Sequence, residues 1–183
     1  MYADAVPIVV QQLITFLEVV GLTTPDLFAG DPTVRDINDL IDDLNAMGEH
    51  ADVDRVARGD AHLAASTLAA YVRNLPEALL PSPHYEQMCS ALDVELYVER
   101  IAALRDIVAE MPEANVVVMH RVLHFLARIG ERGSQYGNGM DMLASFWSTV
   151  LMPSQPGGSR ARGARVKEFR LTGLMLQHCA CIF

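Results

Sequence analysis

Apolar residues recur every three to four positions along most of the chain, and no long stretch alternates between apolar and polar residues. The first pattern is typical of helices with one buried face, whereas the second would indicate strands. The sequence therefore predicts an all-α protein of about seven to eight helices. The expected helices cover residues 6–20, 34–47, 61–75, 82–92, 93–111, 112–129, 138–152 and 161–177, and a polar loop is expected over 49–60.

Several helix ends carry their usual sequence signals. Thr33 is expected to cap the helix that follows it, with the negative charge of Asp36 in its first turn. Gly48 follows the end of that helix. Ser82 and Pro83 read as an N-cap followed by proline at the first helical position. These signals support the helix boundaries that the periodicity predicts.

The 183 residues are enough for one domain with one buried core. We expect a domain body over 1–153, a linker rich in proline, glycine and serine over 154–160, and a basic amphipathic C-terminal helix over 161–183 that belongs to the same domain. No apolar run is long enough to cross a bilayer. We therefore predict a cytoplasmic protein.

Charge divides the chain unevenly. The net charge is −9, but residues 1–153 carry nine arginines against 22 acidic residues, and the remaining residues carry five basic residues against one acid. An acidic body repels phosphate backbones, so no nucleic-acid partner is expected. Basic residues beside apolar ones can instead contact an anionic membrane surface. The candidates for peripheral membrane contact are Arg160, Arg162, Arg165, Lys167 and Arg170.

The residues that bind metals or form disulfides are few. Only three cysteines occur, and two of them nearly adjoin, so no disulfide framework is expected. His120 and His124 stand four positions apart, a spacing that can bind zinc, but no third ligand lies nearby in the sequence. We predict no metal and no cofactor.

Three segments carry a family resemblance. They read PDLFAGDPTVRDINDL over 25–40, LAASTLAAYVRNLPEALLP over 63–81 and MPEANVVVMHRVLHFLARI over 111–129. The first resembles the G-I-F-R-V-S-G loop and following helix of RhoGAP domains, the second their L-L-K-x-Y-L-R-x-L-P-x-P-L helix, and the third a later helix of that fold. The resemblance implies a RhoGAP-like helical bundle and a Rho-family small GTPase as partner.

A narrower resemblance rests on DLFAGDPTVRDINDLIDDLN and on DMLASFWSTVLMP over 141–153. These segments look most like the C-terminal RhoGAP-like domain of the Lowe syndrome type of inositol polyphosphate 5-phosphatases. Such domains lack the arginine finger and bind short peptides of endocytic adaptors. The resemblance thus implies a possible adaptor-peptide partner and a peripheral location on endosomal or Golgi membranes. The chain has no segment resembling the phosphatase catalytic domain, so phosphoinositide hydrolysis is not expected.

The RhoGAP resemblance assigns roles to four positions. Ala29 stands where the arginine finger is expected, Ala69 where a lysine is expected and Met142 where an asparagine is expected, whereas Arg73 keeps its arginine. By the resemblance, Arg73, Ala69 and Met142 face the GTPase. A finger arginine stabilises the charge that develops on the transferring phosphoryl group, which alanine cannot do. Arg35, six residues downstream, is the weak substitute.

We therefore expect a signalling module that binds a Rho-type GTPase, adaptor peptides or both, and that is not an enzyme and has little or no GTPase-activating activity. One alternative is a functional activator that uses another arginine. A second alternative is a scaffold tethered to membranes by its basic tail.

Overall fold

A computed structural model of the protein describes residues 6–152 and 162–183. Within those ranges it contains ten α-helices and no strand, which confirms the all-α prediction. The eight longer helices are α1 (Ile8–Val20), α2 (Val34–Met47), α4 (Ala61–Arg73), α5 (Ser82–Ala91), α6 (Tyr97–Ala109), α7 (Glu113–Arg132), α8 (Met140–Leu151) and α9 (Arg162–Gln177). The shorter elements are α3 (Val53–Val56), α10 (Cys179–Ile182) and the 3₁₀ turns η2 (Gly21–Thr23), η3 (Gly48–His50) and η4 (Ser134–Tyr136).

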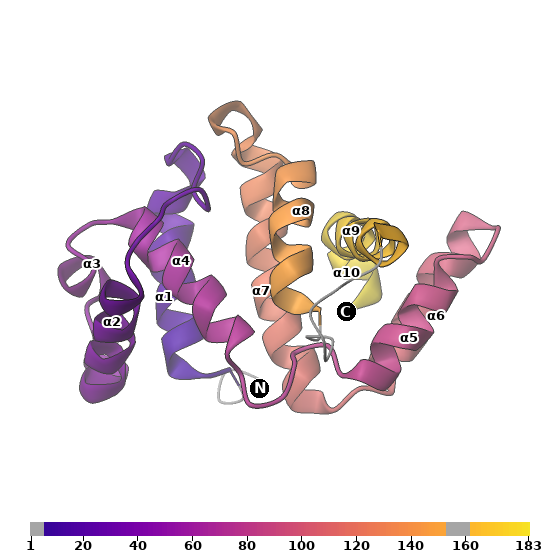
Figure 1. Ribbon diagram of the computed structural model, residues 1–183, viewed down its shortest axis with the longest axis horizontal. Helices are drawn as coiled ribbons and strands as arrows, with labels where there is room; N and C mark the ends of the chain where they lie inside the picture. Colours follow the sequence, from indigo (N-terminus) through magenta and orange to yellow (C-terminus); the bar gives the residue numbers. More distant parts are fainter. Residues whose placement is uncertain (1–5, 153–161) are drawn as a thin grey trace.

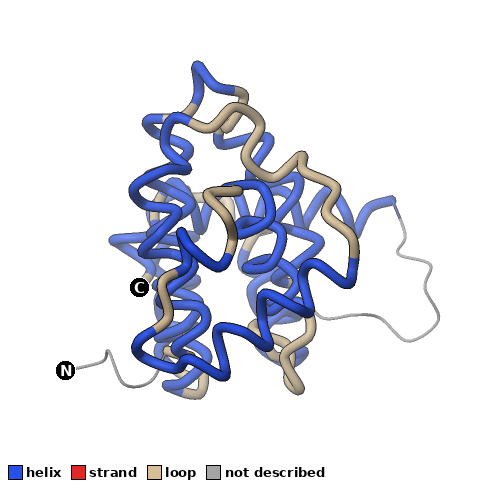
Figure 2. Tube along the Cα trace, turned by 90° about the vertical axis from the view of Figure 1, so that its left-hand side faces the viewer, coloured by secondary structure: helices blue, strands red, loops and turns tan. Residues whose placement is uncertain are grey.

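Helix α7 runs through the middle of the molecule (Figure 1). On one side of it lie α1 and α4, with α2 and α3 outside them. On the other side α8 packs along α9, and α5 and α6 form an antiparallel hairpin at the far edge (Figure 1). The trace turned by 90° shows helices joined by loops throughout the described residues (Figure 2). Contacts of α7 with α1, α8, α9 and α10 make one continuous core.

The core follows from the helical spacing of the apolar residues. Seven apolar residues of α7 are buried, at positions 118, 119, 122, 123, 125, 126 and 129. This three-to-four residue spacing places them on one side of the helix. Trp147 of α8 and Phe125 of α7 are the largest fully buried side chains. None of the described helices combines the length and the apolar character that crossing a membrane demands.

Local signals explain most helix ends, with one correction. Thr33 and Asp36 form the predicted cap: the Asp36 N–H donates to Thr33 Oγ1 at 3.2 Å, and the Thr33 N–H donates to the Asp36 carboxylate at 3.2 Å. At α5 the prediction was wrong by one position, because Pro81 is the N-cap and Ser82 is already helical. Pro83 still lies in the first turn of α5, where a backbone N–H would have no helical partner.

Two further segments differ from the sequence pattern. The loop expected over 49–60 contains the short helix α3, which Asp52 caps by accepting a hydrogen bond from the Arg55 N–H at 3.3 Å. Helix α6 begins at Tyr97 rather than at Asp93. The residue before it, Leu96, is the N-cap and is 61% exposed. The expected linker 154–160 lies outside the described residues.

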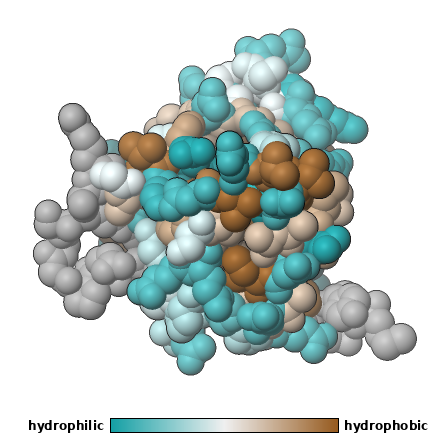
Figure 3. Space-filling view, turned by 90° about the vertical axis from the view of Figure 1, so that its right-hand side faces the viewer, coloured by the Kyte–Doolittle hydropathy of each residue, from teal (hydrophilic) through white to brown (hydrophobic). Residues whose placement is uncertain are grey.

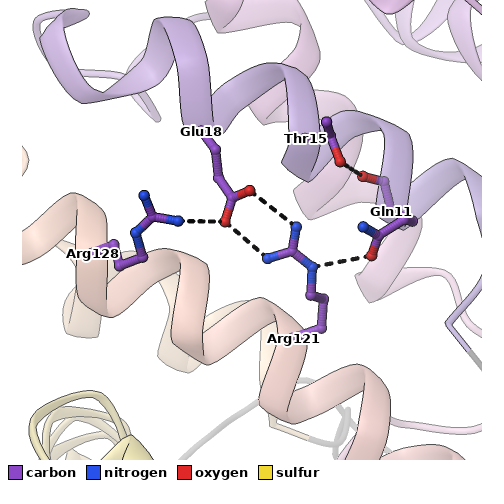
Figure 4. A network of polar contacts seen from close by, with 5 residues as sticks. All are labelled: Gln11, Thr15, Glu18, Arg121 and Arg128. Atoms are coloured by element: carbon purple, nitrogen blue, oxygen red, sulfur yellow. Dashed lines mark hydrogen bonds and ion pairs between the residues drawn. The ribbon is translucent and has the colours of Figure 1, made fainter. Parts of the chain in front are cut away.

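A charged network joins α1 to α7 (Figure 4). The Arg121 guanidinium donates to both carboxylate oxygens of Glu18, at 3.0 and 3.2 Å, and to Gln11 Oε1 at 3.1 Å. Arg128 Nη1 donates to Glu18 Oε1 at 2.9 Å. The hydrogen bond from Arg121, together with the two positive charges, lowers the pKa of Glu18 despite its partial burial. One carboxylate of α1 therefore binds two arginines of α7 that lie about two turns apart.

We expect Glu18→Gln to lower the free energy of unfolding at pH 7 by about 1–2 kcal/mol, because hydrogen bonds to charged groups contribute more than neutral ones. A carboxylate whose pKa is lowered by folding stabilises the fold above its unfolded pKa, and this contribution is lost as pH falls through the folded pKa. The difference between the two proteins should therefore shrink as pH falls below the ordinary value of 4.5. Urea unfolding at pH 7 and pH 3 measures it, and an equal difference at both would contradict the role of the charge.

Candidate functional site

The loop over residues 24–30 exposes Pro25, Asp26 and Ala29. Leu27 and Phe28 are buried, whereas the next residue, Ala29, is exposed. The Phe28 ring lies edge-on to Trp147 of α8, with 5.5 Å between centroids, and 5.3 Å from the ring of Phe146. Aromatic pairs at such distances are favourable beyond the area they bury. Phe28 thus anchors the loop to α8 and leaves position 29 at the surface.

Hydrogen bonds hold the same loop from two sides. The Leu27 N–H donates to Asn138 Oδ1 at 2.8 Å, and the Asn138 amide donates back to the Thr24 carbonyl at 2.8 Å. Asn138 is fully buried. On the other side, His62 Nδ1 lies 3.1 Å from the Leu27 carbonyl oxygen, which makes Nδ1 the donor. Side chains 35 and 111 positions away in the sequence therefore determine the course of the loop.

Close backbone approaches complete this arrangement. Asp26 has a positive φ of 46°, and its N–H donates to the Tyr136 carbonyl at 2.8 Å. Gly137 follows with φ +81°, and a Cβ there would overlap the Asp26 carboxylate. A Cβ on Gly30 would come within 2.6 Å of the His62 Cβ. Glycine is required at both positions, because any side chain would push the loop away from its supports.

Arg35 lies in the first turn of α2, just beyond this loop. Its side chain is 86% exposed, and it forms an ion pair with Asp39 at 3.6 Å. Exposed pairs of this kind contribute about 0–1 kcal/mol, so the guanidinium can turn toward another anion at little cost. Arg35 is therefore an accessible cation six residues beyond Ala29 in the sequence.

A groove of about 410 Å³ separates α2 from the segment that leads into α4. Its walls carry Asp36, Asp39, Asp43 and Asp60, with Arg58 opposite α2. Hydrogen bonds from Thr33 lower the pKa of Asp36, and the positive charges of Arg35 and Arg58 act in the same direction. Arg58 is exposed and has a positive φ of 54°. The sequence did not single it out, because the turn that places it depends on α3.

The three residues predicted to face a GTPase differ in exposure. Arg73 is exposed at the end of α4, and Met142 is half-buried against the core. Ala69 is only 3% exposed and presents almost no side chain to the surface. Arg73 stands 11 residues beyond His62, which is about 16 Å along a helix. The structure therefore does not bring Arg73 to the loop tip, and the contact of all three with a GTPase remains a prediction.

The basic residues of α9 lie on a different face. Lys167 Nζ forms an ion pair with Asp93 at 2.9 Å, and Arg165 and Arg170 are exposed. Val166 and Phe169, between these cations, are 54% and 37% exposed. Arg160 lies outside the described residues, as does the side chain of Arg162. Membrane contact through these residues remains a prediction.

Apolar side chains also show between polar ones on the face that carries the α5–α6 hairpin (Figure 3). Leu96, Tyr97 and Val98, at the start of α6, are 61%, 48% and 79% exposed. The Tyr97 hydroxyl lies 2.5 Å from His178 Nε2, which ties the hairpin to the end of α9. These residues mark a mixed surface rather than one continuous apolar patch.

The two histidines whose spacing could bind zinc, His120 and His124, contact aromatic rings. The ring centroids of His120 and His124 lie 6.0 Å apart. The His120 ring also stacks on the Phe183 ring, with 6.0 Å between centroids. Burial lowers the pKa of His120, and the positive charges of His124 and Arg121 lower it further. Across residues 6–152 and 162–183, no three metal-ligating side chains come together.

The sequence also matches one family model over residues 7–156, that of the RhoGAP domain. The chain belongs to the RhoGAP domain family. Solved structures agree on the fold: human Rho GTPase activating protein 15 superposes with a TM-score of 0.88 at 23% identity, over 98% of this chain and 84% of that one. The BH domain of Graf, the GTPase regulator associated with focal adhesion kinase, gives a TM-score of 0.84 at 17% identity, over 96% and 93% of the two chains.

Curated relatives carry the same kind of name. Human Rho GTPase-activating protein 27 is 27% identical over 178 residues, which is 97% of this RhoGAP chain and 20% of that protein. Mouse Rho GTPase-activating protein 8 is 30% identical over 184 residues, 98% of this chain and 41% of that protein. This RhoGAP chain thus spans between a fifth and two fifths of these relatives.

These relatives correct one expectation. We predicted that the chain is not an enzyme and has little or no activating function, but the proteins that it resembles are named GTPase-activating proteins. The resemblance to the RhoGAP domain family and its fold is confirmed. The narrower resemblance to the Lowe-type 5-phosphatase domain stays a prediction, and so does the absence of an arginine finger at Ala29, which was inferred from the RhoGAP alignment.

Proposed function

We propose that this RhoGAP domain acts on a Rho-family GTPase as a GTPase-activating module. The match to the RhoGAP family over residues 7–156 carries the proposal. Two features of the surface support it: a loop held by hydrogen bonds and packing that leaves Ala29 exposed, and an exposed arginine, Arg35, in the first turn of α2. A rigid loop beside a movable cation suits insertion into a partner's nucleotide site.

Activation requires positive charge at the transferring phosphoryl group. An arginine supplied by the activating partner typically raises the hydrolysis rate by about 10³- to 10⁵-fold. Ala29 has no charge to contribute. Arg35 lies six residues after Ala29 and forms an exposed ion pair with Asp39. Arg73 lies at the opposite end of α4 from the His62 contact, about 16 Å along the helix. We therefore assign the cation to Arg35 and a docking contact to Arg73.

We expect Arg35→Ala to lower the stimulated rate of single-turnover GTP hydrolysis by about 10²-fold or more, because the transition state loses its cation. The measurement uses Rho-family GTPases loaded with GTP and mixed with saturating domain. Binding of the GTP-loaded GTPase should change less than threefold, since Asp39 and the rest of the surface stay in place.

Arg55→Ala is the matched control, because Arg55 is also an exposed arginine but lies on α3. It should leave the stimulated rate unchanged. Loss of activity in Arg73→Ala with full activity in Arg35→Ala would reassign the cation. A wild-type domain that leaves hydrolysis at its intrinsic rate across the panel of Rho-family GTPases would contradict the proposed function itself.

A further inference from the structure

Both backbone polar groups of one loop residue are held by side chains. Leu27 donates its N–H to Asn138 and receives a hydrogen bond from His62 at its carbonyl. Leu27 is fully buried and lies two residues before the exposed tip. We propose that Asn138 and His62 are positioning residues for GTPase activation, which fix the backbone of Leu27 and thereby the loop tip. This inference rests on the proposed function.

Burial makes these hydrogen bonds decisive for the loop. Asn138 and Leu27 have no exposed surface, so the Leu27 N–H is shielded from water and depends on Asn138 for its hydrogen bond. A buried donor left without a partner costs about 1–3 kcal/mol. That penalty favours a loop that moves outward to find solvent. The side chain of Asn138 therefore selects one loop conformation over more solvated alternatives.

The two positioning residues come from different parts of the fold, which fixes the loop in more than one direction. His62 lies in the first turn of α4, and Asn138 stands two residues before α8. The helices themselves are in contact through the core. Asn138 also donates to the Thr24 carbonyl, so it holds both ends of the segment 24–27. The position of the loop is therefore set by α4 and by the segment that leads into α8.

His62 also packs against the loop at Gly30. Its Cβ lies where a side chain on Gly30 would have to be. The residue after Ala29 therefore lies directly against α4, and the tip is supported on both sides: by Leu27 before it and by Gly30 after it. Catalysis by oriented groups is sensitive to displacement, since a shift of about 1 Å can cost about 10²-fold in rate. A loosened loop should therefore lower the rate at saturation.

The experiment compares four variants of the domain. Asn138→Ala removes both amide hydrogen bonds, and His62→Leu removes the donor but keeps an apolar side chain. His62→Asn is the conservative variant, because its amide nitrogen can take the place of Nδ1. Asn115→Ala is the matched control: its amide donates to the carbonyls of Ala78 and Leu79, and so holds a different connection.

Single-turnover hydrolysis is measured against domain concentration, so that the saturating rate and the half-saturating concentration separate. We expect Asn138→Ala and His62→Leu to lower the saturating rate by about tenfold or more, with less than a threefold change in the half-saturating concentration. His62→Asn should keep at least a third of the wild-type rate. Amide hydrogen exchange of residues 25–30 should accelerate in the two impaired variants alone.

Three results would overturn the positioning role. These are an unchanged saturating rate in Asn138→Ala, an equal loss in Asn115→Ala, and a His62→Asn variant as impaired as His62→Leu. The proposed function fails differently. If the wild-type domain does not stimulate any tested GTPase, activation itself is refuted, whereas a stimulating wild type with fully active variants refutes only the positioning role.

Discussion

Ala29→Arg should raise the stimulated rate of GTP hydrolysis by about tenfold or more over the wild-type domain. The exposed loop tip would then carry a guanidinium, and an arginine supplied to the phosphoryl group is worth about 10³- to 10⁵-fold where none is present. The gain is expected to fall below that range because Arg35 already contributes in our proposal. Single-turnover hydrolysis with saturating domain provides the measurement.

Two comparisons make this result specific. Ala29→Met adds a side chain of similar length without charge and should give no increase. The double variant Ala29→Arg with Arg35→Ala should be nearly as fast as Ala29→Arg alone, because the new arginine supplies the charge. If the double variant is as slow as Arg35→Ala, position 29 does not reach the phosphates, and the predicted alignment of the loop is wrong.

Trp147→Ala should lower the free energy of unfolding by about 3–5 kcal/mol, the usual cost of truncating a buried tryptophan. Trp147 is fully buried and lies edge-on to Phe28, so the cavity would open beneath the loop that exposes Ala29. Chemical denaturation gives the loss directly. We also expect the stimulated rate to fall, because the anchor of the loop loses its partner.

Trp147→Phe separates the effect of lost side-chain volume from the effect of the unpaired indole N–H. The indole N–H of Trp147 has no hydrogen-bond partner among the described residues. Trp147→Phe removes this unpaired donor while keeping an aromatic ring against Phe28, so its cost should be much smaller than that of alanine. A similar loss of stability in both variants would show that the aromatic contact contributes little.

The fold could be predicted from local sequence because its determinants are local. The cap of α2 needs only Thr33 and Asp36, three positions apart, and both were visible in the sequence. Longer helices followed from apolar periodicity. The pattern placed the start of α6 four residues too early, and it missed α3, whose four residues are too few to show a period.

The site was harder to predict because long-range contacts build it. The resemblance located Ala29, but nothing near the loop indicated that Asn138 holds it, since 111 positions separate Asn138 from Leu27. His62 likewise has no local feature that marks it as a support. Resemblance also assigned a GTPase-facing role to Ala69, whose burial leaves it almost no exposed surface.

Helix α9 has a consequence for how the domain should be handled. The family match ends at residue 156, yet α9 packs along α8 and also contacts α7 and α5. Five apolar side chains of α9 and α10 are buried in the core: Leu171, Met175 and Leu176 of α9, and Cys179 and Ile182 of α10. A truncated protein ending at residue 156 would keep all the residues that match the family model. It would also expose the side of α8 that packs against α9. The boundary by which the domain is recognised is therefore not the boundary at which it folds.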